Sequence, residues 1–260
     1  MQALGNDFMV IDALTQPITP TAKNIIHWAN RHTGVGFDQC LLIEPPKDAT
    51  HDFFYRIYNA DGTESGQCGN GARCIARYLA RYIARCGQAL KPIITVKTIS
   101  TVMKLRINQD HSVTVSLPEP LFSTCHIKKD PNTSFLLHTA DVGNPHAVLW
   151  VDELDDATIA SLGQFISEHA AFPNRTNVEF VKICSPQHIK LRVYERGIGE
   201  TLACGSGAIA AATVGIQQQR LNGRVQVTLP GGSMFVEWDL GQPVQLTGSA
   251  TFVYDGILIE

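Results

Sequence analysis

Alternation of apolar and polar residues along the chain predicts four β-strands in two pairs. The four runs are rich in β-branched or aromatic side chains, as half-buried strands usually are. They cover residues 93–98, 102–107, 225–229 and 233–238. Each pair follows a segment with helical spacing, so the pattern predicts a helix followed by paired strands at two places in the chain.

The two helical segments differ in polarity. In the first, apolar residues recur at helical spacing and arginines occupy the other positions. The apolar set is Ala72, Ile75, Ala76, Leu79 and Ile83, and the arginines are Arg73, Arg77, Arg81 and Arg85. The second segment, Ala208 to Ile216, is apolar on nearly every side. We therefore expect an amphipathic helix in the first place and a fully buried helix in the second.

An internal repeat relates these two places. The matching segments are Arg56-Ile57-Tyr58-Asn59 with Cys68-Gly69-Asn70-Gly71-Ala72, and Arg192-Val193-Tyr194-Glu195 with Cys204-Gly205-Ser206-Gly207-Ala208. The offset is 136 residues throughout, and Glu64 and Glu200 fall in the same register. A fainter match at an offset of 138 relates residues 4–8 to residues 142–146. The repeat predicts a duplicated unit of strands, a cysteine loop, a helix and further strands.

The boundary between the halves is expected at Pro118-Glu119-Pro120, because two prolines disfavour continuous secondary structure. We predict an α+β fold of two pseudo-symmetric α/β domains. The first, residues 1–118, contains Cys68, and the second, residues 119–250, contains Cys204. A last strand near residues 250–260 should return to the first domain. Equivalent loops of a duplicated unit should face each other across a pseudo-twofold axis, in a cleft of the kind that favours ligand binding.

Composition and charge exclude several classes of function. The chain is 44% hydrophobic and 17% charged, with a formal net charge of −3 and no dense cluster of Lys and Arg. These values argue against a nucleic-acid partner. No apolar run reaches the length of a membrane span, and the first residues lack the basic and apolar regions of a signal peptide. We expect a cytoplasmic protein without a membrane partner.

Seven cysteines occur in the chain: Cys40, Cys68, Cys74, Cys86, Cys125, Cys184 and Cys204. An odd number in a chain of this size argues against a disulfide framework and for free thiols in a reducing compartment. Cys68 and Cys204 each stand just before a predicted helix, and the other five are expected to be structural, most of them as small core residues.

A cysteine at the start of a helix has chemical consequences. The helix dipole and the free backbone N–H groups favour a thiolate over a thiol, and the same N–H groups can bind a carboxylate. Two such loops could place thiols on opposite sides of one carbon that bears a carboxylate. One thiolate would then remove a proton and the opposite thiol would deliver one, which inverts the carbon without a cofactor.

Other interpretations of the cysteine loops fit less well. A single cysteine before a helix is more often structural, but two copies in a duplicated frame favour function. The five-residue gap between Cys68 and Cys74, with no nearby pair of Cys or His, is not a usual zinc set. Neither glycine-rich segment ends in the Gly-Lys-Ser/Thr of a phosphate loop. We expect neither metal nor cofactor.

At these residues the chain resembles the diaminopimelate epimerase family. The matching segments are Leu4-Gly5-Asn6-Asp7-Phe8, Gly36-Phe37-Asp38-Gln39, Asn59-Ala60-Asp61-Gly62, residues 67–74, Gly143-Asn144-Pro145-His146, Arg175-Thr176-Asn177-Val178, residues 194–197, residues 200–201, residues 203–208 and Leu229-Pro230-Gly231-Gly232. They extend over nearly the whole chain. The two cysteine motifs are highly specific when they occur together.

The resemblance implies an isomerase independent of pyridoxal phosphate that interconverts LL- and meso-diaminopimelate, on the route to lysine and peptidoglycan precursors. It implies two domains, each a mixed or antiparallel barrel-like sheet around a central helix. It makes Cys68 and Cys204 the acid–base pair. It implies substrate binding by Asn6, Gln39, Asn59, Gly69, Asn70, Asn144, Asn177, Glu195, Arg196, Gly205 and Ser206, with His146 as a supporting residue.

Individual assignments have physical support and open alternatives. Arg196 could pair bidentately with a distal carboxylate, and asparagines can contact both a carboxylate and an ammonium group. Asn6 and Asn144 each follow a glycine and could instead form turns, and His146 could be a packed core histidine. Asn59, Glu195 and Arg196 rank first, because they lie in the duplicated register beside the cysteines.

Two features depart from the family pattern. Members usually begin with a short strand ahead of the segment that starts at Met1, so we expect a shortened first strand with an exposed sheet edge. Ala3 stands where the family usually has glycine.

The nearest alternatives to this function are a proline racemase-like enzyme and a non-catalytic amino-acid binding module on the same fold. The sequence leaves the oligomeric state open, a homodimer included.

Overall fold

The computed structural model describes residues 1–259, which divide into two compact units. Unit 1 contains residues 1–116 and the segment from Thr247 onward, and unit 2 contains residues 117–246. The chain therefore leaves unit 1 after residue 116 and returns to it at Thr247. From the sequence, the two ends of the second domain were expected at residues 119 and 250. Within the described residues, no helix is both long enough and apolar enough to cross a membrane.

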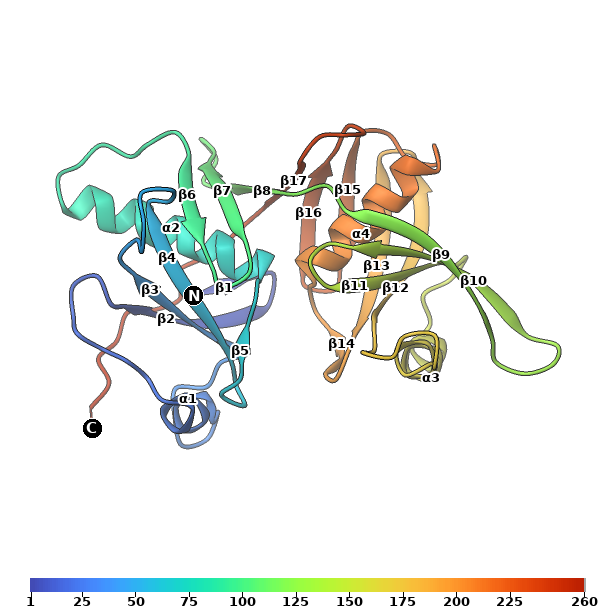
Figure 1. Cartoon of the computed structure of the whole chain (residues 1–260), viewed down its shortest axis with the longest axis horizontal. Helices are drawn as coiled ribbons and strands as arrows, with labels where there is room; N and C mark the ends of the chain where they lie inside the picture. Colours follow the sequence, from blue (N-terminus) through green and yellow to red (C-terminus); the bar gives the residue numbers. More distant parts are fainter. Residues whose placement is uncertain (260) are drawn as a thin grey trace. The chain divides into compact units, whose positions relative to one another are not determined.

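Unit 1 is a mixed sheet with two helices (Figure 1). Its strands are β1 (Gln2–Ala3), β2 (Asn6–Asp12), β3 (Gln39–Glu44), β4 (Phe53–Asn59), β5 (Glu64–Ser65), β6 (Ile94–Lys97), β7 (Val102–Ile107) and β8 (Val113–Leu117). Its helices are α1 (Ala22–Ala29) and α2 (Gly69–Arg85). The pairs β2–β3 and β4–β6 are parallel, whereas β3–β4, β4–β5, β6–β7 and β7–β8 are antiparallel.

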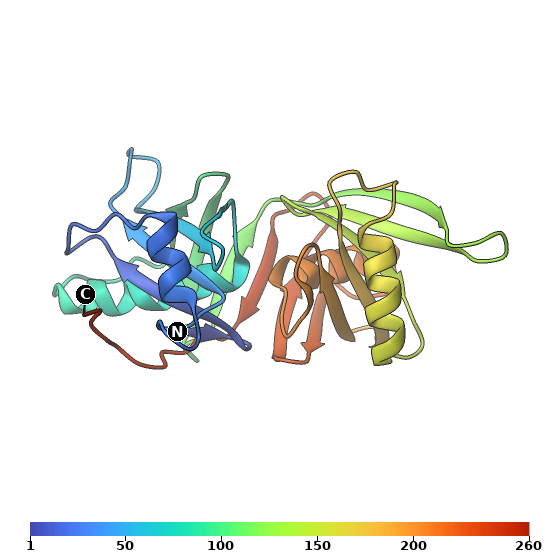
Figure 2. The same cartoon turned by 90° about the horizontal axis from the view of Figure 1, so that it is seen from below.

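Unit 2 repeats this arrangement. Its strands are β9 (Leu121–Lys128), β10 (Ser134–Asp141), β11 (Pro145–Trp150), β12 (Asn177–Ser185), β13 (His188–Glu195), β14 (Gly199–Thr201), β15 (Arg224–Leu229) and β16 (Gly232–Glu237), with helices α3 (Asp156–Ser167) and α4 (Gly205–Gln217). The pairs β11–β12 and β13–β15 are parallel, and β12–β13, β13–β14 and β15–β16 are antiparallel. The β9–β10 hairpin projects beyond the other strands of the unit (Figure 2).

The strand register shows that the duplication extends to individual residues. Phe8 pairs with Gln39 between β2 and β3, and His146 pairs with Asn177 between β11 and β12, at an offset of 138 in both strands. Tyr58 pairs with Glu64, and Tyr194 pairs with Glu200, at an offset of 136. Position-by-position comparison of the two units is therefore justified.

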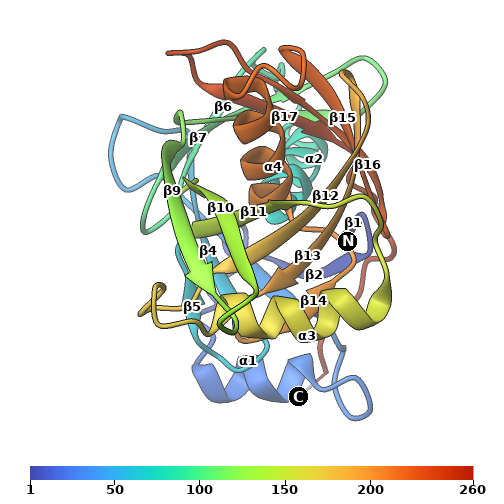
Figure 3. The same cartoon turned by 90° about the vertical axis from the view of Figure 1, so that its right-hand side faces the viewer.

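Each unit packs its strands on both sides of the sequence-predicted helices. α4 contacts β10, β11, β12, β13, β15 and β16, and nearly all its residues are buried, which confirms the prediction of a buried helix. α2 contacts β1, β2, β3 and β7. On the outer side, α3 lies against β12, β13 and β14 (Figure 3) through a core that includes Ile159, Ile166 and Phe180. α1 packs in the same way through Ile25 and Ala29.

The end of the chain differs from the sequence expectation. The last strand is β17 (Val244–Gly248), which pairs with β8, and beyond it only Thr251 forms an isolated bridge, with Gln2. Residues 252–259 are in no strand, although a strand was expected near 250–260. β1 has two residues, and its Gln2 pairs with Asp7 of β2 and bridges to Thr251.

Two expectations about burial are also corrected. Arg73 belongs to the polar set of its helix by spacing, but it is fully buried, because residues 70–76 at the start of α2 are enclosed on all sides. Cys86 and Cys184 are exposed, because each lies at the end of an element rather than inside it. Cys40 and Cys74 are core residues as expected.

Candidate active site

The two motif cysteines occupy the same structural position in the two units. Cys68 is the N-cap residue of α2 and Cys204 is the N-cap residue of α4, both with extended backbone. The sulfur of Cys68 accepts a hydrogen bond from the Gly71 N–H at 3.3 Å, and the sulfur of Cys204 accepts one from Gly207 at 3.4 Å. This confirms the expected helix starts, and one free N–H group of each first turn points at its thiol.

Close packing beneath the first turn explains a glycine in each motif. A Cβ atom on Gly71 would lie 3.0 Å from Leu41 Cδ2. A Cβ atom on Gly207 would lie 2.9 Å from Glu179 Oε1 and 3.2 Å from Val193 Cγ2. Both helices therefore start directly on the strand below them, and this fixes the height of each cysteine above its sheet.

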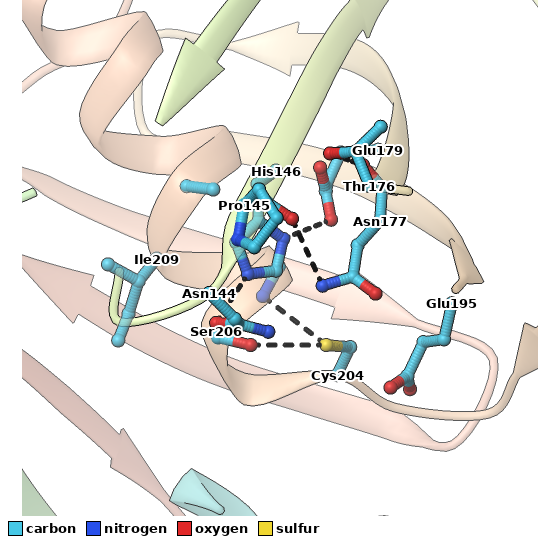
Figure 4. A network of polar contacts seen from close by, with 12 residues as sticks. Asn144, Pro145, His146, Thr176, Asn177, Glu179, Glu195, Cys204, Ser206 and Ile209 are labelled. Carbon is cyan, nitrogen blue, oxygen red and sulfur yellow. Dashed lines mark hydrogen bonds and ion pairs between the residues drawn. The ribbon is translucent and has the colours of Figure 1, made fainter. Parts of the chain in front are cut away.

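A buried polar network surrounds Cys204 (Figure 4). His146 Nδ1 lies 2.6 Å from Glu179 Oε1, and both side chains are fully buried. The other ring nitrogen of His146, Nε2, lies 3.0 Å from Asn144 Oδ1. Ser206 Oγ lies 3.5 Å from the Cys204 sulfur. Asn144 and His146 thus contact each other within this network.

Electrostatics around Cys204 favour the thiol form. Burial, followed by the negative charge of Glu195, raises the pKa of Cys204 well above its ordinary value, and Glu179 adds to this effect. Hydrogen bonds from Ser206 and Gly207 act in the opposite direction but are smaller. The sequence-based expectation that the helix start lowers the thiol pKa is therefore wrong for Cys204 in this structure, because desolvation outweighs the helix terminus.

In unit 1, four of the predicted substrate-binding residues form two hydrogen-bonded pairs. Asn70 Nδ2 donates to Asn6 Oδ1 at 3.2 Å, and Gln39 Nε2 donates to Asn59 Oδ1 at 2.9 Å. Asn6 Nδ2 also donates to Asp38 at 2.9 Å. Asn6 begins β2, after a two-residue turn, so its side chain combines the turn position with contact to the cysteine loop.

In unit 2, Asn177, Glu195 and Arg196 lie at adjoining strand ends. Asn177 is buried, and its Oδ1 accepts a hydrogen bond from the Arg196 backbone N–H at 3.0 Å. The Thr201 hydroxyl donates to Glu195 Oε1 at 2.5 Å. The Arg196 side chain is exposed, and its Nη1 donates a hydrogen bond to the Asn174 carbonyl at 3.5 Å.

Sequence reasoning missed two charged residues beside the cysteines. Glu179 is fully buried in β12, where a lone acidic residue interrupts the apolar run from Val178 to Val181. Arg73 is fully buried in α2 and donates to Asn70 Oδ1 at 2.8 Å. The available signal for Glu179 was its isolation among apolar residues, since a buried acid requires a partner.

The described residues provide no cluster of three or more His, Cys, Asp or Glu side chains that could hold a metal ion. Each cysteine loop instead offers a thiol and a set of backbone N–H donors. These groups can transfer protons and bind an anion.

Solved structures with a similar fold place the chain in a broad class. A hydroxyproline epimerase from Agrobacterium vitis matches with a TM-score of 0.71 at 16% identity, covering 98% of this chain and 89% of that one. A PhzF-family phenazine biosynthesis protein from Bacillus anthracis matches with a TM-score of 0.68 at 16% identity, covering 100% and 95%. The chain therefore has the two-domain α+β fold that these two proteins share.

Sequence comparisons narrow this class to one family. The family model described as diaminopimelate epimerase matches residues 1–121 and 138–253. Proteins named diaminopimelate epimerase from two strains of Legionella pneumophila, Paris and Lens, are 48% identical over 274 residues, covering 100% of this chain and 98% of each relative. The chain belongs to the diaminopimelate epimerase family.

Proposed function

We propose that this protein is an isomerase that interconverts LL-2,6-diaminopimelate and meso-diaminopimelate by a two-base mechanism. The observation that supports it is the pair of cysteines at equivalent helix N-caps of a duplicated fold, in a member of this family. A thiolate removes the α-proton from one face and a thiol protonates the other face. Cys68 and Cys204 have these roles, which exchange when the direction reverses.

The α-carboxylate is held by backbone N–H groups of the cysteine loops, at Gly69 and Asn70 in one and at Gly205 and Ser206 in the other. Two features support this part of the proposal. Each loop is the start of a helix of more than twelve residues, and helix starts bind anions through free N–H groups and the dipole. The mechanism requires both loops to act on one substrate molecule, residues 1–118 providing one and residues 119–250 the other.

The remaining substrate groups are recognised by Asn6, Gln39, Asn59, Asn144, Asn177, Glu195 and Arg196. The exposed guanidinium of Arg196, which donates to the Asn174 carbonyl, is suited to the distal carboxylate. Glu195 is suited to an ammonium group. His146 supports the site by fixing Asn144. The reaction serves the synthesis of lysine and of peptidoglycan precursors, in the cytoplasm and without a cofactor.

Proton NMR of LL-diaminopimelate in D2O tests the proposal. We expect loss of the α-proton signal and growth of the meso isomer with reduced protein and no cofactor. Cys68→Ala and Cys204→Ala should each abolish conversion, while Cys184→Ala, which changes an exposed thiol outside the site, should retain it. Conversion of proline but not of diaminopimelate would support a proline racemase-like enzyme instead. Binding without exchange would support a non-catalytic module.

A further inference from the structure

The two cysteine loops have different ionisable groups beneath them. Because the strand registers repeat, Leu41 in β3 corresponds to Glu179 in β12, and Phe8 in β2 corresponds to His146 in β11. At the offset of the cysteines, Arg73 in α2 corresponds to Ile209 in α4. Unit 2 thus has a buried carboxylate and histidine where unit 1 is apolar, and unit 1 has a buried guanidinium where unit 2 is apolar.

Arg73 is a buried cation whose hydrogen-bond partners are all neutral. Its Nε donates to the Ser249 carbonyl at 3.1 Å, its Nη1 to the Gly69 carbonyl at 3.4 Å, and its Nη2 to Asn70 Oδ1 at 2.8 Å. Among residues 1–259, no carboxylate forms an ion pair with it. A fully buried charge without a counter-charge is costly, so an anion is expected nearby.

The candidates for that anion are few. Within residues 1–259, the groups that interact electrostatically with Arg73 are Cys68, the N-cap of its helix, and Cys74 in the helix. Burial raises the pKa of Cys74 to about 12, so Cys74 stays a thiol at neutral pH. Tyr55, which faces the same thiols from β4, is also neutral, because burial raises its pKa well above 10. The Met1 ammonium, which acts on Cys74, is a second cation. Among the groups of residues 1–259 that act on Arg73, Cys68 is therefore the one candidate anion.

We propose that Arg73 is the counter-ion that keeps Cys68 as a thiolate in the free protein, while Glu179 and Glu195 keep Cys204 as a thiol. Arg73 acts as a positioning residue in a second way, because it holds Asn70 in the loop through Oδ1 while Asn70 donates to Asn6. The inference rests on the proposed function only in naming Cys68 the resting base and Cys204 the resting acid.

The two carboxylates that face Cys204 favour this assignment. Glu179 approaches from β12, Glu195 from β13, and His146, paired with Glu179, from β11. The neighbouring hydroxyl of Ser206 is neutral. Within residues 1–259, the groups that most strongly shift the Cys204 pKa include no Lys or Arg.

The pH dependence of alkylation at each cysteine tests the proposal. The reduced wild-type protein is treated briefly with iodoacetamide between pH 5 and pH 10, and modification at each cysteine is measured by peptide mass spectrometry. Each profile is normalised to its own maximum, so that the different exposure of the two thiols does not matter. We expect a midpoint for Cys68 at least two pH units below that for Cys204. A midpoint for Cys204 at or below that for Cys68 would overturn the proposal.

Variants at position 73 separate charge from packing. Arg73→Met should raise the Cys68 midpoint by at least one pH unit and lower its alkylation rate at pH 6 at least tenfold, whereas Arg73→Lys should retain most of the effect. Arg81→Met, on the same helix but paired with Asp255 at the surface, should leave the midpoint unchanged. An unchanged midpoint in folded Arg73→Met would overturn the role of Arg73. If Arg73→Met does not fold, the alkylation midpoints of Cys68 and Cys204 in the wild-type protein and in Arg73→Lys test the proposal.

The same experiment distinguishes this inference from the proposed function. A low Cys68 midpoint that depends on Arg73, in a protein that does not exchange the α-proton of diaminopimelate, would support the charge assignment and reject the epimerase. Full epimerisation with equal alkylation midpoints for Cys68 and Cys204 would support the epimerase and reject the charge assignment.

Discussion

At the scale of single residues, the site depends on a few buried polar groups that have no equivalent in the other half. The pair of His146 and Glu179 is the clearest case, because both side chains are fully buried at 2.6 Å from each other. Breaking such a pair leaves one buried polar group unsatisfied, while replacing both with apolar groups avoids that cost. The protein itself contains the apolar version, as Phe8 and Leu41 in unit 1.

A double-mutant cycle should reveal this dependence. Glu179→Leu alone removes the partner of His146 Nδ1, and we expect the free energy of unfolding to fall by about 1–3 kcal/mol. The double variant His146→Phe, Glu179→Leu should recover much of that loss, since it copies unit 1. Urea unfolding followed by circular dichroism measures both. A single variant no less stable than the double would contradict the expected coupling.

The residues of the site also show what a sequence can reveal about its chemistry. The cysteines and their glycines were predicted from residue type and repeat, and the polar motif residues from the resemblance to a known family. In the structure His146 and Asn144 contact each other. Arg73 and Glu179 were not identified, because local spacing does not show burial. At residues 70–76 every face of the helix is covered, so periodicity carries no information there.

At the scale of elements, the starts of α2 and α4 determine where the thiols lie. The four strands predicted with bounds, which are β6, β7, β15 and β16, and the starts of α2 and α4 were placed to within one or two residues. Hydrophobic spacing and the N-cap position are local signals, which explains this accuracy. The single strand that the sequence misplaced, near residues 250–260, depends on a partner edge far away in the chain. Non-local pairing of this kind is not encoded in a short window.

Adding a methyl group at these helix starts should affect the two units unequally. Gly207→Ala places a Cβ atom 2.9 Å from Glu179 Oε1, which His146 holds in place, and 3.2 Å from Val193. Gly71→Ala meets only the end of the Leu41 side chain, at 3.0 Å. We expect Gly207→Ala to lower the free energy of unfolding by about 1–3 kcal/mol, typical of overpacking, and Gly71→Ala by less. Chemical denaturation of the two variants compares them. Equal losses would show that Glu179 can move.

At the scale of the whole molecule, the duplicated fold buries thiols in both halves, and this has a consequence for stability. Burial raises the pKa of Cys40 and of Cys74 to about 12, and the pKa of Cys204 is raised as well. These groups hold their protons in the folded protein at pH values where the unfolded chain has released them. Their contribution to stability is therefore complete below the unfolded pKa, near 8.5–9, and is lost as the pH rises towards the folded values.

Alkaline pH should accordingly destabilise the protein. Each such thiol lowers the free energy of unfolding by about 1.4 kcal/mol per pH unit between the two pKa values. Urea unfolding at pH 8, 9 and 10 measures the slope. Cys40→Val, which removes one buried thiol and preserves an apolar side chain, should reduce the slope, whereas Cys184→Val at an exposed position should not. A stability that does not change from pH 8 to pH 10 would contradict the raised pKa values.

The proposed two-base mechanism makes one further demand on the molecule as a whole, because both thiols must reach the same carbon. Sulfur atoms that approach opposite faces of one small substrate can bond to each other when the substrate is absent and an oxidant is present. Mild oxidation of the free protein should therefore link Cys68 to Cys204 with a mass loss of about 2 Da, abolish epimerisation, and be reversed by dithiothreitol. Diaminopimelate should protect against this oxidation.

A control variant, Cys86→Ala with Cys184→Ala, removes the two exposed thiols that could otherwise form intermolecular links. Peptide mass spectrometry identifies the linked pair. If oxidation inactivates that variant through some other pair, or dithiothreitol fails to restore activity, the proposal that the two cysteine loops act on a single substrate carbon loses its support.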